Sequence, residues 1–149
     1  MRLTRKLMFA IEAVVDIAYN SGVNPVQSKD IAERQGIPRR YLEQVLQQLV
    51  RADVLRGVRG PRGGYRLARE RRRIALGEIV RIVAGMDDED ERENATGSEL
   101  GRVVLQPLWQ EMEDDALTRL DSVSVEDLCR TAREAGIDSR SKKSVDFTI

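Results

Sequence analysis

Apolar residues recur at intervals of three and four near the start of the chain, which is the spacing of one buried helix face. This spacing predicts a helix over Leu3 to Tyr19. It returns over Ser28 to Gln35, with Ser28 as the expected N-cap, and over Pro38 to Arg51. Gly36 stands between these two segments, where glycine is a typical helix end. Two helices joined by a glycine-containing turn indicate a helix-turn-helix.

The pattern changes from helical spacing toward alternation over Val54 to Arg69, which reads VLRGVRGPRGGYRLAR. Glycines and Pro61 occupy the middle of this stretch, and a tight turn needs such residues, so we expect a β-hairpin. Its expected cationic rim consists of Arg56, Arg59, Arg62, Arg66 and Arg69. A hairpin directly after two such helices is the order of a winged helix-turn-helix.

Helical spacing resumes beyond the hairpin, over Ile74 to Val83. The next stretch, Met86 to Glu99, is strongly acidic and is predicted to be a loop. Leu100 to Leu120 has apolar residues at steps of four, which predicts a long helix with a soft interruption at Pro107. A last short helix is expected over Val125 to Ala135.

The expected fold is therefore mainly α with a small β-hairpin wing, and the chain divides into four parts. Residues 1–85 form a winged helix-turn-helix DNA-binding domain, and residues 86–99 form an acidic loop. Residues 100–135 hold a long dimerisation helix and a short C-terminal helix that Ser124 caps. Residues 136–149 are expected to be a flexible tail.

The balanced total charge hides a division along the chain. Residues 1–85 contain 17 Lys and Arg against 8 Asp and Glu, whereas residues 86–149 contain 8 against 17. A basic half with helical and hairpin signals suggests a polyanion partner, and an acidic half is free for self-association or regulation. A solvated charged surface with no partner is the alternative.

One cysteine, Cys129, and no histidine limit the chemistry. A disulfide within the chain is excluded, and ordinary zinc, iron and His-based catalytic sites lack their ligands. We therefore expect no enzyme and no metal site, with Cys129 as a small core residue and a redox role as the alternative. No run approaches 18 apolar residues, and Glu12 and Asp16 interrupt the first helix, so a cytoplasmic protein without a membrane segment is expected.

The expected helix over Pro38 to Arg51 carries a polar stripe opposite its apolar face. Arg can recognise guanine, Gln adenine and Glu cytosine, so the stripe suits a major groove. Cations before the first helix oppose its dipole and suggest an external anion such as DNA phosphate. The candidate DNA-binding residues are Arg2, Thr4, Lys6, Ser28, Arg39, Arg40, Tyr41, Glu43, Gln44, Gln47, Arg51, Arg59, Gly60, Pro61, Arg62 and Gly63. A winged-helix protein-interaction adaptor is the alternative from another class.

The long helix has a broad apolar side beyond an already complete small domain. Such a side needs a partner surface, and the same helix in a second subunit is the simplest one. Packing against its own domain alone is the alternative. The candidate dimerisation residues are Leu100, Val104, Leu108, Trp109, Met112, Leu117 and Leu120.

These segments together resemble the Rrf2 family of bacterial transcription regulators. The matching stretches are MRLTRK, DIAERQGIPRRYLEQVLQQLVRADVL, VRGPRGGYRLAR and LGEIVRIV, and the helix around LWQEM matches more loosely. The resemblance implies a homodimer on a partly palindromic operator, dimerised through Leu100 to Leu120. It also implies that Arg40 and Glu43 lie near bases and Tyr41 near the backbone. For the wing it implies minor-groove contacts by Arg59, Gly60 and Pro61.

Many members of this family hold an iron–sulfur cluster through three cysteines in the segment before the dimerisation helix. Here that segment reads MDDEDERENATGSE and contains no cysteine, so we expect a member without an ordinary cluster and without a cofactor. Unusual cluster ligands such as Glu12 with Cys129 stay open, and with them an iron–sulfur or redox-responsive regulator.

Other members regulate cysteine metabolism, in one case through a complex with cysteine synthase. Serine acetyltransferase docks into that enzyme through a C-terminus ending in isoleucine, and this sequence ends in DFTI. Capture of a terminal carboxylate is a known binding mode. We therefore expect a homodimeric regulator, a repressor, with a possible role in cysteine or sulfur metabolism; a tail that packs on its own dimer is the alternative. The candidate partner-binding residues are Phe147, Thr148 and Ile149.

Overall fold

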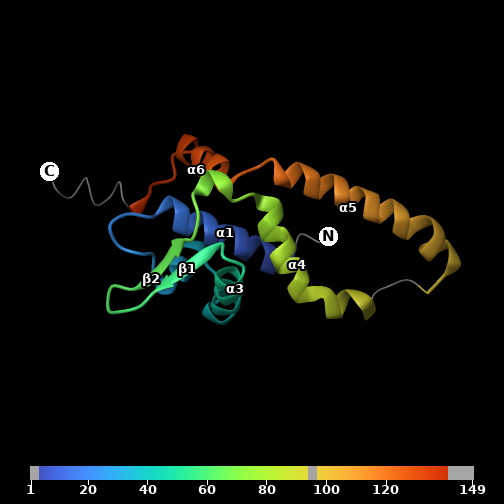
Figure 1. The fold of residues 1–149 in the computed structure, drawn as a ribbon, viewed down its shortest axis with the longest axis horizontal. Coiled ribbons are helices and arrows are strands. Elements are labelled where there is room, and N and C mark those ends of the chain that lie inside the picture. Colours follow the sequence, from blue (N-terminus) through green and yellow to red (C-terminus); the bar gives the residue numbers. More distant parts are fainter. Residues whose placement is uncertain (1–3, 94–96, 141–149) are drawn as a thin grey trace.

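The computed structural model describes residues 4–93 and 97–140 and is mainly helical, with one two-stranded antiparallel hairpin (Figure 1). The elements in chain order are α1 (Arg5–Tyr19), α2 (Ser28–Gln35), α3 (Arg39–Arg51), β1 (Leu55–Val58), β2 (Gly64–Leu67), the 3-10 turn η1 (Arg71–Arg73), α4 (Leu76–Glu93), the π-helical segment η2 (Gly101–Leu105), α5 (Gln106–Asp121) and α6 (Val125–Glu134). The predicted fold class is confirmed. In these two ranges no helix is long and apolar enough to cross a membrane.

Helix α1 lies at the centre of the molecule and contacts α2, α3, α4, α6 and strand β2 (Figure 1). Its buried positions are small or branched, and Ala10, Ala13 and Ile17 are fully buried, so neighbours pack closely on several sides. The Thr4 hydroxyl accepts a hydrogen bond from the Leu7 amide at 3.2 Å and so caps the first turn. Since burying a side chain such as Ile17 contributes about 1.5–3 kcal/mol, α1 is the axis of the hydrophobic core.

A buried ion pair fixes α2 on α1. The side chain of Asp16 is completely buried, and the Arg34 Nε and Nη2 atoms donate to its two oxygens at 2.9 Å each. Gln35 Nε2 donates to Asp16 Oδ2 at 2.8 Å. The hydrogen bond to Asp16 is the main cause of a raised pKa of Arg34. Because a buried carboxylate is tolerated only when it is paired in this way, the contact sets how α2 sits on α1.

The turn between α2 and α3 differs from expectation at its edges. Gly36 has φ 65° and ends α2, as predicted. Ser28 is not the N-cap, however, because the backbone at Gln27 is still extended and Ser28 is the first helical residue, with no capping hydrogen bond. Pro38 is the N-cap residue of α3 and does not lie inside its first turn.

The hairpin is anchored to the body by a short bridge. Strands β1 and β2 pair from Leu55 opposite Leu67 to Val58 opposite Gly64. The Val26 amide donates to the Tyr65 carbonyl at 3.0 Å, and the Tyr65 amide donates back at 2.8 Å. A Cβ at Gly64 would lie 2.4 Å from the Val26 carbonyl oxygen, so only glycine allows this approach. The loop before α2 therefore supports strand β2.

Helix α4 is longer than predicted. It runs from Leu76 to Glu93, so the prediction of a loop from Met86 is wrong for residues 86–93. No proline follows Gly85 in this stretch, and Asp and Glu are tolerated in a helix whose first turns are already packed. Residues 94–96 of the expected loop lie outside the described residues.

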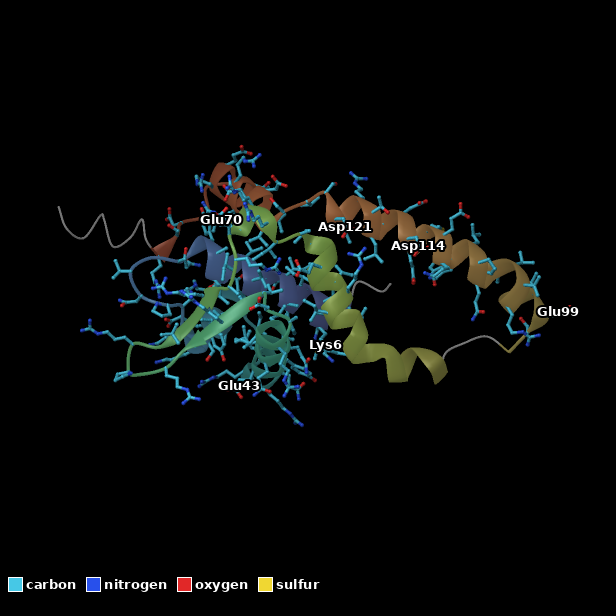
Figure 2. All side chains as sticks on the ribbon, in the orientation of Figure 1. Lys6, Glu43, Glu70, Glu99, Asp114 and Asp121 are labelled. Atoms are coloured by element: carbon cyan, nitrogen blue, oxygen red, sulfur yellow. The ribbon has the colours of Figure 1, made fainter. Side chains whose placement is uncertain are left out.

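The long helix is interrupted near the predicted place. Pro107 lies in the first turn of α5, directly after the π-helical segment η2. Proline has no amide hydrogen, so the regular hydrogen bond from position 107 cannot form, and the backbone adopts wider turns before it. Helix α5 then extends away from the body (Figure 1). Its C-terminal end, next to the body, is held by Arg81 of α4, whose guanidinium donates to Asp121 at 2.6 and 2.9 Å (Figure 2).

Helix α6 returns the chain to the core. The Ser124 hydroxyl accepts from the Asp127 amide at 3.1 Å, and the Asp127 carboxylate accepts from the Ser124 amide at 2.9 Å, which confirms the predicted cap as a reciprocal capping box. Cys129 is fully buried, as expected for a small core residue, and burial raises the pKa of its thiol.

The start of the expected flexible tail is held in place. The Tyr19 hydroxyl donates to the Ile137 carbonyl, and the Arg140 amide donates to Asn20 Oδ1 at 2.8 Å. Residues 137–140 therefore contact the body of the molecule, and the flexibility expected for residues 136–149 stays a prediction. Residues 141–149, which contain the candidate partner-binding residues Phe147, Thr148 and Ile149, lie outside the described residues.

Candidate nucleic-acid interface

Helix α3 buries one face and exposes the other. Its apolar residues Leu42, Val45, Leu46 and Leu49 are at most 1% exposed, as their spacing predicts. The opposite face is open to solvent, and Glu43 lies on its outer side, away from α6 (Figure 2). The predicted stripe of Arg40, Glu43 or Gln44, and Gln47 is exposed, and the exposed DNA-binding candidates of α3 are Arg39, Arg40, Tyr41, Glu43, Gln44, Gln47 and Arg51.

The side chains of this stripe are not engaged elsewhere. Within residues 4–93 and 97–140, none of the seven forms a hydrogen bond or an ion pair. On α6, by contrast, Arg130 donates to Asp127 at 2.9 Å. The α3 donors and acceptors can therefore bind an outside partner without breaking a bond inside the chain. Guanidinium, amide and carboxylate groups on one helix face are the set that recognises base edges.

The tip of the hairpin is a glycine turn between two arginines. The Gly63 amide donates to the Gly60 carbonyl at 2.9 Å, and Gly60 has φ 112°. A Cβ at Gly63 would lie 2.2 Å from the Val58 carbonyl oxygen, so a larger residue would open the turn. Arg59 and Arg62 are exposed and form no hydrogen bond or ion pair in the described part of the chain. Two guanidinium groups are thus available at a tip narrow enough for a groove.

Two arginines of the expected cationic rim form hydrogen bonds within the chain. Arg66 donates to the Gly22 and Val23 carbonyls at 3.1 and 2.6 Å. Arg69 donates to the Asp53 carbonyl at 3.2 Å and to Glu78 Oε1 at 2.5 Å. The prediction that all five rim arginines are available for phosphate is therefore wrong for these two, because backbone carbonyls and a carboxylate already bind them.

The basic run after the hairpin points to the other side of the molecule. Arg71 pairs with Glu126 of α6, and Arg72 Nε donates to Glu70 at 2.6 Å. Figure 2 places Glu70 beside α6 and far from Glu43. These cations lie away from the α3 face and are partly neutralised, so they add little to the interface.

The N-terminal candidates are less exposed than the α3 stripe. Thr4 and Lys6 are half-buried, and the Thr4 hydroxyl already caps α1. Ser28 is half-buried in the first turn of α2. Arg2 lies outside the described residues. The candidate interface therefore consists mainly of the α3 face and the wing tip.

Two positioning residues were missed by sequence reasoning. Asp16 and Arg34 touch no candidate partner, yet their ion pair holds α2, and α2 packs against α3. The signal was present, because Asp16 lies on the apolar face of α1 between Ala13 and Ile17. An acid in that place requires a partner.

Helix α5 presents a second, apolar surface. Leu108, Trp109 and Met112 of α5 are between 51% and 62% exposed, as are Leu100 and Val104 in the segment directly before α5 at 63% and 53%, and α5 has no fully buried residue. The other two candidates, Leu117 and Leu120, are partly buried against the core of their own chain. Large apolar side chains gathered on one helix are typical of a protein interface.

Among the described residues, no group of three or more Cys, His, Asp and Glu side chains could hold a metal ion. The one thiol in the sequence, Cys129, is fully buried and has a raised pKa, so it favours the neutral form that binds metals poorly. Glu12 is half-buried, and burial raises the pKa of its carboxyl group as well. These donors do not fit an iron–sulfur cluster.

Comparison with known proteins gives consistent matches along almost the whole chain. Residues 3–131 match the family model Rrf2, described as an iron-dependent transcriptional regulator. The HTH-type transcriptional regulator IscR of Xenorhabdus nematophila is 35% identical over 141 residues, which cover 94% of this chain and 86% of the relative. IscR of Escherichia coli is 33% identical, with 94% and 87% covered.

Solved structures agree with these matches. The structure of T. potens IscR has a TM-score of 0.74 and 32% identity and covers 93% of both chains. CymR, whose title calls it the global cysteine regulator of B. subtilis, has a TM-score of 0.68 and 26% identity, with 88% of this chain and 98% of that chain covered.

Proposed function

Because this chain belongs to the Rrf2 family of transcriptional regulators, we propose that it binds operator DNA as a homodimer and represses transcription there. One observation carries the DNA part of the proposal. The polar face of α3 holds seven exposed side chains with no partner in the described residues, next to a wing tip with two exposed arginines. In this proposal the α3 face recognises the bases, and the wing contacts the DNA backbone or the minor groove.

The role of single residues follows from their chemistry. Arg40 and Gln44 are one helical turn apart on α3, so they reach neighbouring base pairs in one groove, and Glu43 accepts from cytosine. Arg59 enters the minor groove at the wing. Arg51 at the end of α3 is placed to bind phosphate, which adds affinity but no sequence preference.

A variant in the α3 stripe tests this assignment. Arg40→Ala should lower the ratio of specific to non-specific DNA affinity by roughly 5- to 150-fold, the range of about 1–3 kcal/mol expected for one bidentate base contact. Fluorescence anisotropy with DNA selected from a random library, repeated at several salt concentrations, measures this ratio. Arg130→Ala on α6 removes the same charge from another surface and should leave the ratio unchanged. Equal losses in both variants would mean that net charge, and not α3, determines binding.

The homodimer is supported by the apolar surface of α5. A half-exposed leucine, valine, tryptophan or methionine gains about 1–2 kcal/mol when a partner covers it, so five of them favour association strongly. A second copy brings two α3 helices to one duplex, which fits a palindromic operator. Repression follows if the dimer covers promoter DNA. A promoter–reporter fusion tests it, because loss of the protein should raise expression and an activator would give the opposite change.

A cysteine synthase partner is a second proposal. It is supported by the similarity to CymR, which is titled a cysteine regulator, and by the ending Phe147–Ile149. Binding of the full chain to purified cysteine synthase, measured by calorimetry, should be lost in Ile149→Ala and in a variant with one extra residue after Ile149. Binding that survives both changes would exclude the tail as the docking segment.

No iron–sulfur cluster forms part of the proposal. The family description contains the words iron-dependent, but the described donors do not fit a cluster, and residues 86–99 contain no cysteine. Signal reception must therefore use another part of this chain.

A further inference from the structure

A cavity of about 470 Å³ lies on the side of the molecule that carries α6, away from the α3 face. The ends of α1 and α6, strand β2, η1 and the segment 136–139 form its walls. Its volume is in the range of sites for small molecules. The lining residues that matter here are Ala18, Tyr19, Leu67, Arg71, Arg133 and Ile137.

Two arginines give the cavity its charge. Arg71 is held in place by its ion pair with Glu126 and by a contact with the Cys129 thiol. Arg133, on the last turn of α6, is exposed and donates no hydrogen bond within the described residues. Asp138 is the one carboxylate among the lining residues, so the lining itself carries one formal positive charge, while Glu126 outside the lining pairs with Arg71. Guanidinium groups bind carboxylate and phosphate oxygens with paired hydrogen bonds.

The rest of the lining is partly apolar. Ala18 and Leu67 belong to the core or pack against it, and Ile137 adds an exposed aliphatic side chain. A molecule with a short hydrocarbon body and one anionic group matches this combination. An inorganic ion would leave the apolar part of the wall uncovered.

The wall formed by residues 136–140 is connected to the wing. The Tyr19 hydroxyl donates to the Ile137 carbonyl, and Arg140 Nη2 donates to the Asn24 carbonyl at 2.9 Å. The loop that holds Asn24 also holds Val26, which pairs with Tyr65 of β2. The C-terminal segment is therefore hydrogen-bonded to this loop.

The wing is also hydrogen-bonded to this loop, through strand β2. Arg66 of β2 donates to the Gly22 and Val23 carbonyls. A glycine at position 64 lets the strand lie directly against Val26. Among the described residues, the loop over residues 20–26 thus forms hydrogen bonds both with the wing strand and with the segment 137–140.

We propose that this cavity binds a small organic anion between Arg71 and Arg133, and that its occupation tightens the segment 136–140 on the loop that supports the wing. The ligand class is a short carbon chain with a carboxylate or a phosphate group. Binding near Ile137 favours the arrangement in which Arg140 holds the loop, so the hydrogen bonds between Val26 and Tyr65 open less often. The consequence for transcription rests on the wing contact with DNA proposed above.

Titration of the full chain with butyrate and, separately, with propyl phosphate tests the site at constant ionic strength. Backbone amide shifts of Ala18, Gly136 and Ile137 should saturate with one of the two probes, with a dissociation constant below about 1 mM. The responding probe identifies the carboxylate or the phosphate class. The absence of saturation with both probes up to about 10 mM would overturn the proposal.

Matched variants on one helix locate the binding. Arg133→Gln should weaken binding by at least roughly tenfold, because one of two guanidinium groups is lost. Arg130→Gln, one turn earlier on α6, should bind as the unchanged chain does. Both side chains are exposed, so both variants should keep the fold, and circular dichroism checks this. Equal binding by the two variants would overturn the site.

Hydrogen exchange tests the connection without DNA, so it can fail while the proposed function stands. The amides of Val26 and Tyr65 should exchange more slowly as the probe saturates. In Arg140→Ala the probe should still bind, but the slowing should be lost, since the bond to the Asn24 carbonyl is absent. An unchanged exchange rate in the unmodified chain would overturn the connection to the wing.

Discussion

Helices α3 and α5 are both amphipathic, yet they turn opposite faces to the solvent. Helix α3 buries four apolar residues and exposes polar and charged ones, whereas α5 has no fully buried residue and exposes leucine, tryptophan and methionine. The polar face is stable in water and suits nucleic acid. Exposure of the apolar face to water is unfavourable in free energy until another surface covers it. The contrast supports the proposals that α3 contacts DNA and that α5 contacts a second copy of the chain.

The largest expected effect concerns α5. Trp109→Asp combined with Met112→Asp should weaken the homodimer by about 4 kcal/mol, roughly a thousandfold in its dissociation constant, because unpaired carboxylates would enter an apolar interface. Analytical ultracentrifugation across a concentration series measures the constant. Thr118→Asp adds a charge to an exposed polar position of the same helix and should leave the dimer intact. A dimer that resists the double change would remove α5 from the assembly.

The next effect concerns the support of α3. Asp16→Ala should lower the free energy of unfolding by about 3 kcal/mol, since Arg34 and Gln35 lose their shared buried partner. Glu12→Ala, one turn earlier on α1, removes a half-buried carboxyl group whose pKa burial raises, and it should change stability little. Urea unfolding at one protein concentration compares the two variants. Similar values for both would show that the ion pair does not hold α2.

The wing gives a smaller effect on binding. Arg59→Ala should weaken specific DNA binding by about 2 kcal/mol, because a guanidinium group leaves the groove. Arg72→Ala is the control, since Arg72 pairs with Glu70 on the side that faces α6. Anisotropy titrations at two salt concentrations measure both. Unchanged affinity in Arg59→Ala would remove the wing from the mechanism.

The smallest effect concerns α6, where the chain returns from α5 to the body. Ser124→Ala should lower the free energy of unfolding by about 1 kcal/mol through the lost helix cap. The Ser124 amide and then its hydroxyl lower the pKa of Asp127. A lowered pKa means that the carboxylate stabilises the fold above its ordinary value of about 3.8, and that this contribution disappears as the pH falls through the lowered value.

Thermal unfolding between pH 6 and pH 2 checks the direction of this pH dependence of stability. The stability difference between the unchanged chain and Asp127→Asn should be largest at the upper end and should close at the acid end. A difference that grows toward low pH would contradict the capping role of the carboxylate.

Much of the fold could be predicted from the sequence because the relevant signals are local. The spacing of Leu42, Val45, Leu46 and Leu49 identified the buried face of α3, and the glycines around Pro61 identified the wing. The same spacing showed which α3 side chains are exposed. The predicted boundaries were wrong at Ser28, at Pro38 and at the end of α4, where neighbouring structure decided whether the backbone was helical.

The order of the elements, the polar face of α3 and the apolar face of α5 therefore follow from local patterns along the chain. The fold in three dimensions determines which charged side chains already form hydrogen bonds or ion pairs within the chain. Arg59 and Arg66 look alike in the sequence, but Arg66 binds the Gly22 and Val23 carbonyls 44 and 43 residues away. The contact of Arg140 with Asn20 spans 120 residues, and no local pattern encodes it. Helical spacing depends on neighbours in the chain, whereas the partners of a charge depend on where the fold brings distant segments together.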